Sequence, residues 1–202
     1  MASEITSRGE LSRIAILQSA YDLFTSQGYH GTSMRQIAEK SEIALGGLYN
    51  HYDSKEQIFK AVFVEFHPLY EVLPALSAAQ GDKIEQLVHD TLERMLAALD
   101  VRPNFMNLMF IEVVEFKSAH MGELFSEFLP SLIELIEQLK QKDRERLRNI
   151  PTLMLLRAFM GMFFGYYLSE IILAPNTPAE FSENAPDYFV EIFLHGTLKD
   201  CA

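Results

Sequence analysis

The residues between positions 32 and 55 that could bind another molecule are hydrogen-bond donors, and their types suit a nucleic acid. The planar guanidinium of Arg35 matches both a guanine edge and a phosphate group. The hydroxyl of Thr32 or Ser33 could add a donor at the start of the same segment. Gly46 and Gly47 let a ligand approach the backbone closely. These residues predict binding by contact rather than a covalent reaction.

The sequence contains no pattern typical of an enzyme. It has no glycine-rich phosphate loop, no nucleophile elbow and no histidine–cysteine cluster at metal-ligand spacing. Its six histidines are scattered along the chain. We therefore expect no catalytic residue, no metal and no cofactor.

Apolar spacing around these donors predicts two short helices joined by a tight turn. The first helix covers about residues 33–40, the turn follows at Ser41-Glu42, and the second helix covers about residues 44–49. Leu48 faces inward on the second helix. Its outer face carries Ala44, Leu45, Gly47 and Asn50. This is the layout of a helix-turn-helix, whose second helix enters the major groove of DNA.

The segment also resembles the N-terminal domain of TetR-family transcriptional repressors. The matching residues are Thr32-Ser33, Arg35, Ile37-Ala38, Gly46-Gly47-Leu48-Tyr49, His51-Tyr52 and Ser54-Lys55-Glu56. Detailed resemblance covers about residues 11–63, and the rest fits in length and all-helical character. The resemblance implies that Tyr49, His51 and Lys55 contact DNA phosphates. For Tyr49 the alternative is packing between helices, and for His51 and Lys55 it is ordinary surface charge.

The predicted DNA-binding set departs from the family pattern in two places. It contains Thr32, Ser33, Arg35, Ala44, Leu45, Gly46, Gly47, Tyr49, Asn50, His51 and Lys55. Glu42 stands where such turns usually carry glycine, and a positive φ there would cost about 1 kcal/mol. The outer face also lacks the Lys or Thr often seen in the family. Contacts of Ala44 and Leu45 with thymine methyl groups, together with DNA shape, could supply specificity instead.

Composition and charge suit a cytoplasmic protein with a localised DNA-binding surface. The net charge is −11, but residues 1–60 hold six Lys/Arg against seven Asp/Glu, so the acidity lies mainly beyond them. The single cysteine, Cys201, permits no disulfide within the chain, and no signal peptide is visible. The apolar run 153–173 is interrupted by Arg157, Ser169 and Glu170, which favours a buried helix over a membrane span.

The whole chain predicts an all-α fold of about nine helices. We expect a helix-turn-helix DNA-binding domain over residues 1–53 and a helical ligand-binding and dimerisation domain over residues 54–202. The segment 71–82 contains Pro74, small residues and Gly81, so we interpret it as a partly irregular link. The remaining helices are expected at about 10–26, 54–66, 83–100, 103–118, 122–148, 151–173 and 187–198.

Two further surfaces are predicted in the second domain. Soft, aromatic and charged residues that could line a site for a lipophilic ligand are Met95, Phe105, Met109, Glu112, Phe116, Arg157, Phe159, Phe163 and Tyr166. Small and aromatic residues of the last two helices that could form a dimer interface are Ala158, Gly161, Gly165, Ser169, Phe189 and Phe193. For each set the alternative is packing within one chain.

These predictions combine into a ligand-responsive DNA-binding regulator. We expect a repressor that binds a near-palindromic operator as a homodimer, without a membrane, and that a lipophilic small molecule releases. The resemblance implies that the ligand shifts the fourth helix. The alternative function is a helical lipophile-binding or interaction module with a weakened DNA-binding head, since the face over Ala44–Gly47 is bare.

Overall fold

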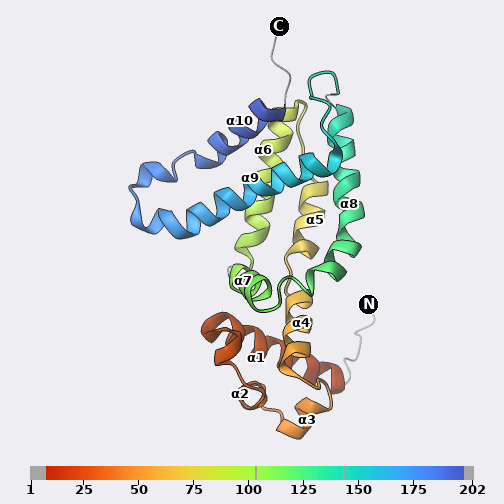
Figure 1. Cartoon of the computed structure of the whole chain (residues 1–202), viewed down its shortest axis with the longest axis vertical. Helices are drawn as coiled ribbons and strands as arrows, with labels where there is room; N and C mark the ends of the chain where they lie inside the picture. The colour runs from red at the N-terminus through yellow and green to blue at the C-terminus, as the bar shows by residue number, and fades with distance from the viewer. Residues whose placement is uncertain (1–7, 103, 143, 198–202) are drawn as a thin grey trace, which may run out of the picture. The chain divides into compact units, whose positions relative to one another are not determined.

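The chain folds into α-helices, which confirms the all-α prediction (Figure 1). The computed structural model describes residues 8–102, 104–142 and 144–197, and these ranges contain no β-strand. The helices are α1 (Arg8–Gly31), α2 (Met34–Lys40), α3 (Leu45–Tyr49), α4 (Lys55–Glu65), α5 (Leu69–Ser77), α6 (Ile84–Asp100), α7 (Phe105–Glu115), α8 (Met121–Lys142), α9 (Thr152–Leu173) and α10 (Ala185–Thr197). Two 3₁₀ turns, η1 (Ala174–Asn176) and η2 (Ala179–Phe181), join α9 to α10.

The helices group into two compact units. The first unit contains α1–α4 and α7, and it ends at Pro68 before resuming over Arg102–Phe125. The second unit contains α5, α6, most of α8, α9 and α10. The boundary between residues 53 and 54 stays a prediction, since the compact unit around the helix-turn-helix also includes α4 and α7.

An aromatic core holds the first unit together. Phe24 of α1 and Phe59 of α4 are almost fully buried, and their ring centroids lie 5.4 Å apart. Phe116, which follows α7, stacks on Phe59 at 4.7 Å and meets Tyr29 edge-on at 4.9 Å. Aromatic pairs at such distances each contribute roughly 0.5–1.5 kcal/mol beyond the burial of their surface. The core therefore fixes α1 against α4, and the helix-turn-helix lies between these two helices in the chain.

Most of the predicted helices are confirmed to within a few residues. Six residues that helical spacing places on one face of α6 are all buried: Ile84, Leu87, Val88, Thr91, Met95 and Leu99. The predicted helix over 122–148 ends instead at Lys142. The start predicted at Pro103 and the end predicted at Leu198 lie outside the described residues.

The prediction of an irregular link over residues 71–82 was wrong for its first half. Helix α5 occupies Leu69–Ser77 and contains Pro74. Proline removes one backbone hydrogen bond from a helix interior. Here Val72 and Leu76 are buried and α5 packs along α6, so tertiary packing outweighs the local preference.

His67 is a buried histidine in the first unit and gives it a specific pH dependence. Its ring lies 4.7 Å from that of Phe105 and 5.4 Å from that of Phe63, and burial lowers its pKa to about 4. As the pH falls, His67 is therefore protonated near pH 6.5 in the unfolded chain but only near pH 4 in the folded chain. The stability that the buried, neutral His67 ring contributes is fully present above pH 6.5 and is lost as the pH falls toward 4.

Replacing His67 with leucine should remove this pH dependence. Between pH 7 and pH 5 the free energy of unfolding of the wild type should fall by about 2 kcal/mol more than that of His67→Leu, because the variant has no imidazole to protonate. Urea unfolding at both pH values measures the difference. Parallel pH profiles for the two proteins would contradict it.

Candidate nucleic-acid interface

The first helix of the helix-turn-helix is capped by residues that the sequence supplies locally. The hydroxyl of Ser33 accepts a hydrogen bond from the backbone N–H of Gln36 at 3.3 Å, and the Gln36 side chain accepts one from the Ser33 N–H at 2.8 Å. This reciprocal capping box satisfies two free donors at the helix start. Ser33 is therefore the cap of α2, and the spacing Ser-x-x-Gln that forms the capping box is readable in the sequence.

The turn between α2 and α3 is strained at one residue and closely packed at another. Glu42 has φ = 57°, so the left-handed conformation considered for this position is the one observed. A side chain on Gly47 would place its Cβ 3.1 Å from a methyl carbon of Ile43. Gly47 therefore allows the turn to pack against α3, whereas Gly46 has open space around it.

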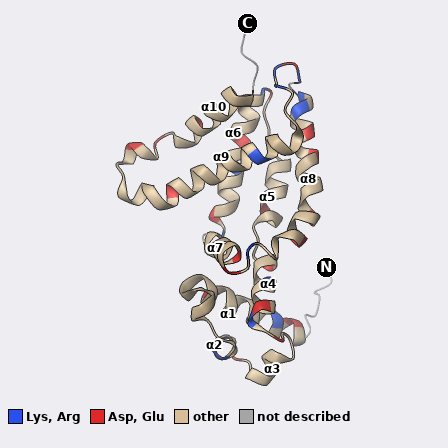
Figure 2. Ribbon diagram, viewed as in Figure 1, with Lys and Arg blue, Asp and Glu red and all other residues tan. Residues whose placement is uncertain are grey.

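The outer surface of α2 and α3 gathers most of the predicted DNA-binding residues. The exposed members of the predicted set are Ser33, Arg35, Ala44, Leu45, Gly46, Tyr49, Asn50 and His51. Arg35 forms no hydrogen bond or ion pair with any residue in the described ranges, so its five donors are free for a ligand. Lys40, in contrast, pairs with Asp22 of α1 at 3.1 Å. Arg35 is therefore the cation that this surface offers to a ligand. Helix α3 itself carries no charged residue (Figure 2).

Two residues of the predicted set are occupied inside the chain. Thr32 is only 2% exposed, and its hydroxyl donates to the Gly28 carbonyl oxygen at 2.9 Å. The Lys55 ammonium donates to the carbonyl oxygens of Tyr29 and Thr32, both at 2.7 Å. It also lies 4.1 Å from the centroid of the Tyr29 ring. In this structure both side chains connect α1 to the elements that follow, so direct phosphate contacts through them lack support.

The position of Lys55 has a clear physical cause. Gly28 takes φ = 76° and interrupts the regular helix, and the Tyr29 carbonyl oxygen after it accepts a turn hydrogen bond from the Thr32 N–H at 3.2 Å. The Lys55 side chain, in the first turn of α4, reaches the carbonyl oxygens of Tyr29 and Thr32. Burial lowers the pKa of Lys55, and Glu115 opposes that shift. The spacing of 26 residues between Tyr29 and Lys55 gave no local signal for this contact.

Removing the Lys55 ammonium should destabilise the first unit. In Lys55→Met the carbonyl oxygens of Tyr29 and Thr32 lose their charged donor, so the free energy of unfolding should fall by about 2 kcal/mol. Chemical denaturation measures this change.

The matched control is Lys60→Met on the same helix. Lys60 pairs with Glu123 at 2.7 Å, but both side chains are exposed, so its removal should change stability by less than about 1 kcal/mol. If Lys55→Met is as stable as the wild type and only its DNA affinity is reduced, Lys55 contacts a DNA phosphate instead.

The predicted ligand-binding residues are divided between the two units. Phe105, Met109, Glu112 and Phe116 belong to the first unit, where Phe105 and Phe116 pack in the aromatic core. Glu112 is fully buried and accepts hydrogen bonds from the backbone N–H of His120 at 2.7 Å and from its ring nitrogen Nδ1 at 2.8 Å. The sequence could not reveal this pairing, because it depends on the turn after α7.

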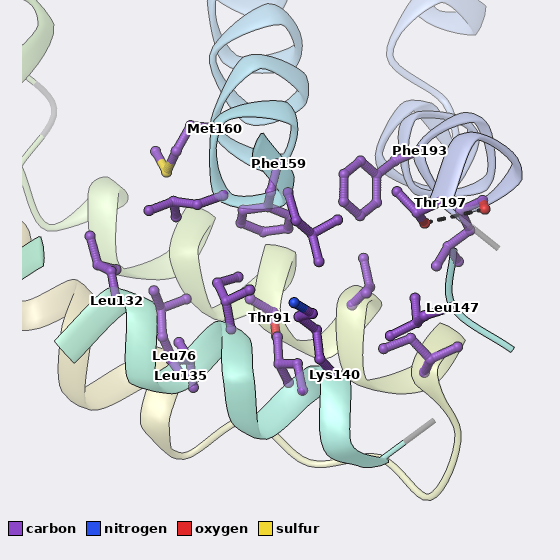
Figure 3. Close-up of a pocket in the computed structure, with 17 residues that line it drawn as sticks. Leu76, Thr91, Leu132, Leu135, Lys140, Leu147, Phe159, Met160, Phe193 and Thr197 are labelled. Atoms are coloured by element: carbon purple, nitrogen blue, oxygen red, sulfur yellow. Dashed lines mark hydrogen bonds between the residues drawn. The ribbon is translucent and has the colours of Figure 1, made fainter. Parts of the chain in front are cut away.

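The second unit contains a cavity between α5, α6, α8, α9 and α10 (Figure 3). Leucine, isoleucine and valine side chains form most of its wall, and the space free for water-sized molecules is about 50 Å³. Of the predicted ligand residues, Phe159 lines it, whereas Met95, Arg157, Phe163 and Tyr166 belong to the second unit without lining it. The contribution of α5 and α8 to the lining of this cavity was not predicted from the sequence.

Helix α9 has only four buried residues in the single chain, contrary to the prediction of a buried helix. Its buried residues are Leu155, Leu156, Phe159 and Phe163. An exposed stripe runs along its other side through Met154, Ala158, Gly161, Gly165 and Ile172. Among the described helices, α9 with η1 (Thr152–Asn176) is long and apolar enough to cross a membrane, and 11% of its most apolar stretch is buried.

Two predicted dimer residues face the interior of the chain. Phe193 lines the cavity and meets Phe159 edge-on at 5.8 Å, and Phe189 meets Tyr166 at 5.6 Å. The helical period turns their neighbours Tyr188 and Ile192 outward, and Ile192 is 72% exposed. Figure 2 shows few charged residues along α9 and α10.

Comparison with known proteins points to one family. The family described as "Bacterial regulatory proteins, tetR family" matches residues 16–62, which include α2, α3 and most of α4. An uncharacterised helix-turn-helix transcriptional regulator of Bacillus subtilis, YvkB, is 21% identical over 92% of this chain and 96% of its own length.

Solved structures share the fold over almost the whole chain. A TetR-family transcription regulator of Shewanella sp. PV-4 has a TM-score of 0.69 at 21% identity and covers 93% of this chain and 98% of its own. NalD of Pseudomonas aeruginosa, the secondary repressor of the MexAB-OprM multidrug efflux pump, has a TM-score of 0.65 at 23% identity and covers 97% and 100%.

Proposed function

We propose that this chain, which belongs to the TetR family of DNA-binding transcriptional regulators, is a homodimeric repressor released from a near-palindromic operator by a lipophilic small molecule. The observation that supports DNA recognition most strongly is the exposed guanidinium of Arg35 on α2, which has no hydrogen-bond or ion-pair partner among the described residues. A rigid base holds that face, because Leu48 of α3 and Ile37 of α2 are fully buried. We also propose that the protein acts in the cytoplasm.

The proposed contacts divide into positioning and recognition. Tyr49, His51 and Ser33 are exposed donors that suit phosphate oxygens, which position a protein on DNA without reading its sequence. Arg35 suits a guanine edge or a phosphate. Gly46 has open space in the free protein and lets the start of α3 approach the DNA backbone. Ala44 and Leu45 supply apolar contacts to thymine methyl groups.

Selection of bound DNA from a random pool tests this proposal. The purified chain should enrich a near-palindrome, and its mass on that DNA should correspond to two chains. Arg35→Ala should weaken binding to the selected site by about tenfold or more, since a good guanidinium contact is worth roughly 1–3 kcal/mol.

Lys40→Ala is the matched control on the same helix, because Lys40 already pairs with Asp22. It should change the affinity by less than about threefold, as expected for an exposed ion pair. A well-folded chain that enriches no sequence at low salt would contradict DNA recognition. That outcome would favour a lipophile-binding module with a weakened head.

The exposed sides of α9 and α10 form the proposed dimer surface. The stripe of Ala158, Gly161 and Gly165 permits close helix approach, and Tyr188 and Ile192 add large apolar side chains. Contiguous apolar surface of this kind is costly to leave in water. A second copy would cover it through the same residues on both subunits, as a two-fold interface requires.

Placing a charge in this surface should separate the subunits. Ile192→Glu would bury a carboxylate at the proposed contact, so the mass in solution should change from two chains to one. Sedimentation equilibrium measures the mass, and circular dichroism verifies that the helices persist. Glu191→Gln, at the neighbouring exposed position, serves as the control and should leave the dimer unchanged. A dimeric Ile192→Glu protein would place the interface elsewhere.

The cavity of the second unit is the proposed effector site. Its aliphatic lining favours a lipophilic ligand, and Met160 at its wall is a side chain that adapts readily to a new shape. A ligand releases the repressor only if it binds the DNA-free state more tightly than the DNA-bound state.

A further inference from the structure

Of the residues that the structure places around the cavity of the second unit, only three carry a polar side-chain group. They are Thr91, Lys140 and Thr197, and the other lining residues are leucine, isoleucine, valine, phenylalanine and methionine (Figure 3). A ligand inside the cavity can form a hydrogen bond only if one of these groups, or the backbone, is available to it.

The two threonine hydroxyls of the lining already donate their hydrogens within the chain. The Thr91 hydroxyl donates to the Leu87 carbonyl oxygen at 2.6 Å, and the Thr197 hydroxyl donates to the Leu194 carbonyl oxygen at 3.3 Å. A hydroxyl has a single hydrogen, so neither threonine can donate to a ligand as well.

The Lys140 ammonium is held by residues that do not line the cavity. It donates to the Thr152 hydroxyl oxygen at 2.9 Å and lies 3.5 Å from a carboxylate oxygen of Glu137, and neither partner belongs to the lining. Long charged side chains commonly place their hydrocarbon stem along apolar surface and keep their charge away from it. Lys140 therefore contributes the methylene groups of its stem to the wall.

The backbone around the cavity is also bonded within the chain. Every lining residue except Leu147 lies in a helix, where the N–H and carbonyl groups bond to one another. At the end of α10, the Thr197 carbonyl oxygen accepts a hydrogen bond from the Arg148 N–H at 2.9 Å. The cavity therefore presents an almost wholly hydrocarbon surface to a ligand.

We propose that this cavity binds a compact, uncharged hydrocarbon, such as a small aromatic or alicyclic ring, and excludes ligands whose buried part carries a charge or a hydrogen-bonding group. A carboxylate, ammonium or hydroxyl that entered would lose its hydrogen bonds with water and gain none from the wall. A hydrocarbon has no such bonds to lose, and it removes its own apolar surface from water. The inference rests on the lipophilic effector of the proposed function and adds the chemical class of that effector.

The free space in the cavity favours a compact ligand and requires the wall to move. It is about 50 Å³, whereas an apolar cavity of roughly 150 Å³ in another protein holds one benzene molecule. Met160 is the most adaptable apolar residue of the lining, because its side chain has three rotatable bonds. Five helices supply the wall, and one of them, α8, begins in the first unit at Met121. Widening the cavity would therefore displace a helix whose chain continues into the DNA-binding unit.

Calorimetric titration of the full chain with toluene, phenol and benzoate at neutral pH, each below its solubility limit, tests this assignment. The three probes share a benzene ring and differ in the group attached to it. Toluene should bind at least about tenfold more tightly than phenol, because the phenol hydroxyl would find no partner in the cavity. Benzoate should show no binding at the same concentrations, because its charge would be buried without a partner.

Two variants of the lining test where the probes bind. Leu156→Ala enlarges the cavity at its wall and should strengthen toluene binding by about threefold or more. Thr91→Val removes a lining hydroxyl with little change of shape, so the preference for toluene over phenol should stay the same.

Leu153→Ala is the matched control, since Leu153 lies on the same helix as Leu156 but is 52% exposed and does not line the cavity. It should bind all three probes as the wild type does. If circular dichroism shows that Leu156→Ala is unfolded, Leu156→Val removes a single carbon and should give a smaller gain in toluene affinity.

Phenol or benzoate that binds as tightly as toluene, or no toluene binding to the wild type and to a folded Leu156 variant, would overturn the inference. Toluene affinity that is unchanged in a folded Leu156→Ala protein would also overturn it, because the ligand would then bind elsewhere. The DNA affinity of the same preparations, measured without any probe, distinguishes this failure from a failure of the proposed function. If the chain binds its selected DNA but prefers benzoate, it is a DNA-binding regulator whose effector is not a hydrocarbon.

Discussion

The contact between the Lys55 ammonium and the carbonyl oxygens of Tyr29 and Thr32 is the constraint on which the DNA-binding surface depends. Gly28 interrupts α1 through its positive φ, and the chain then turns toward α2. Lys55 donates to the two carbonyl oxygens from the first turn of α4, while Phe24 and Phe59 pack beneath. This contact joins the segment before α2 to the start of α4, so it fixes the geometry of the two short helices between them.

That geometry explains how an acidic protein can recognise DNA with few cations. Helices α2 and α3 are only seven and five residues long, so neither would be stable alone. Burial of Ile37, Ala38 and Leu48, with α2 packed on α1 and on α3, keeps them folded. The outer face can then use small residues that permit close approach, and Arg35 pairs with no residue in the described part of the chain. The left-handed backbone at Glu42 is a local cost of about 1 kcal/mol that this packing offsets.

The sequence predicted those features that depend on local patterns. The α2–α3 unit and the helix that became α6 were predicted from side-chain periodicity, and the structure confirms them. Features that depend on long-range packing were missed. Pro74 suggested a break where packing on α6 keeps α5 helical. Lys55 was predicted to contact a phosphate, because its carbonyl partners lie more than 20 residues away in the sequence. The cavity was also missed, because its lining comes from five helices and not from one methionine-rich stripe.

Hydroxyl-radical footprinting of the chain on its selected DNA tests most directly whether two copies of this surface bind one DNA site. Two recognition helices in a dimer should protect two patches whose centres lie about 34–36 Å apart, or a multiple of that spacing, on one face of the duplex. Protection should be symmetric about the centre of the site. A single protected patch, or continuous protection that follows no helical period, would contradict the account.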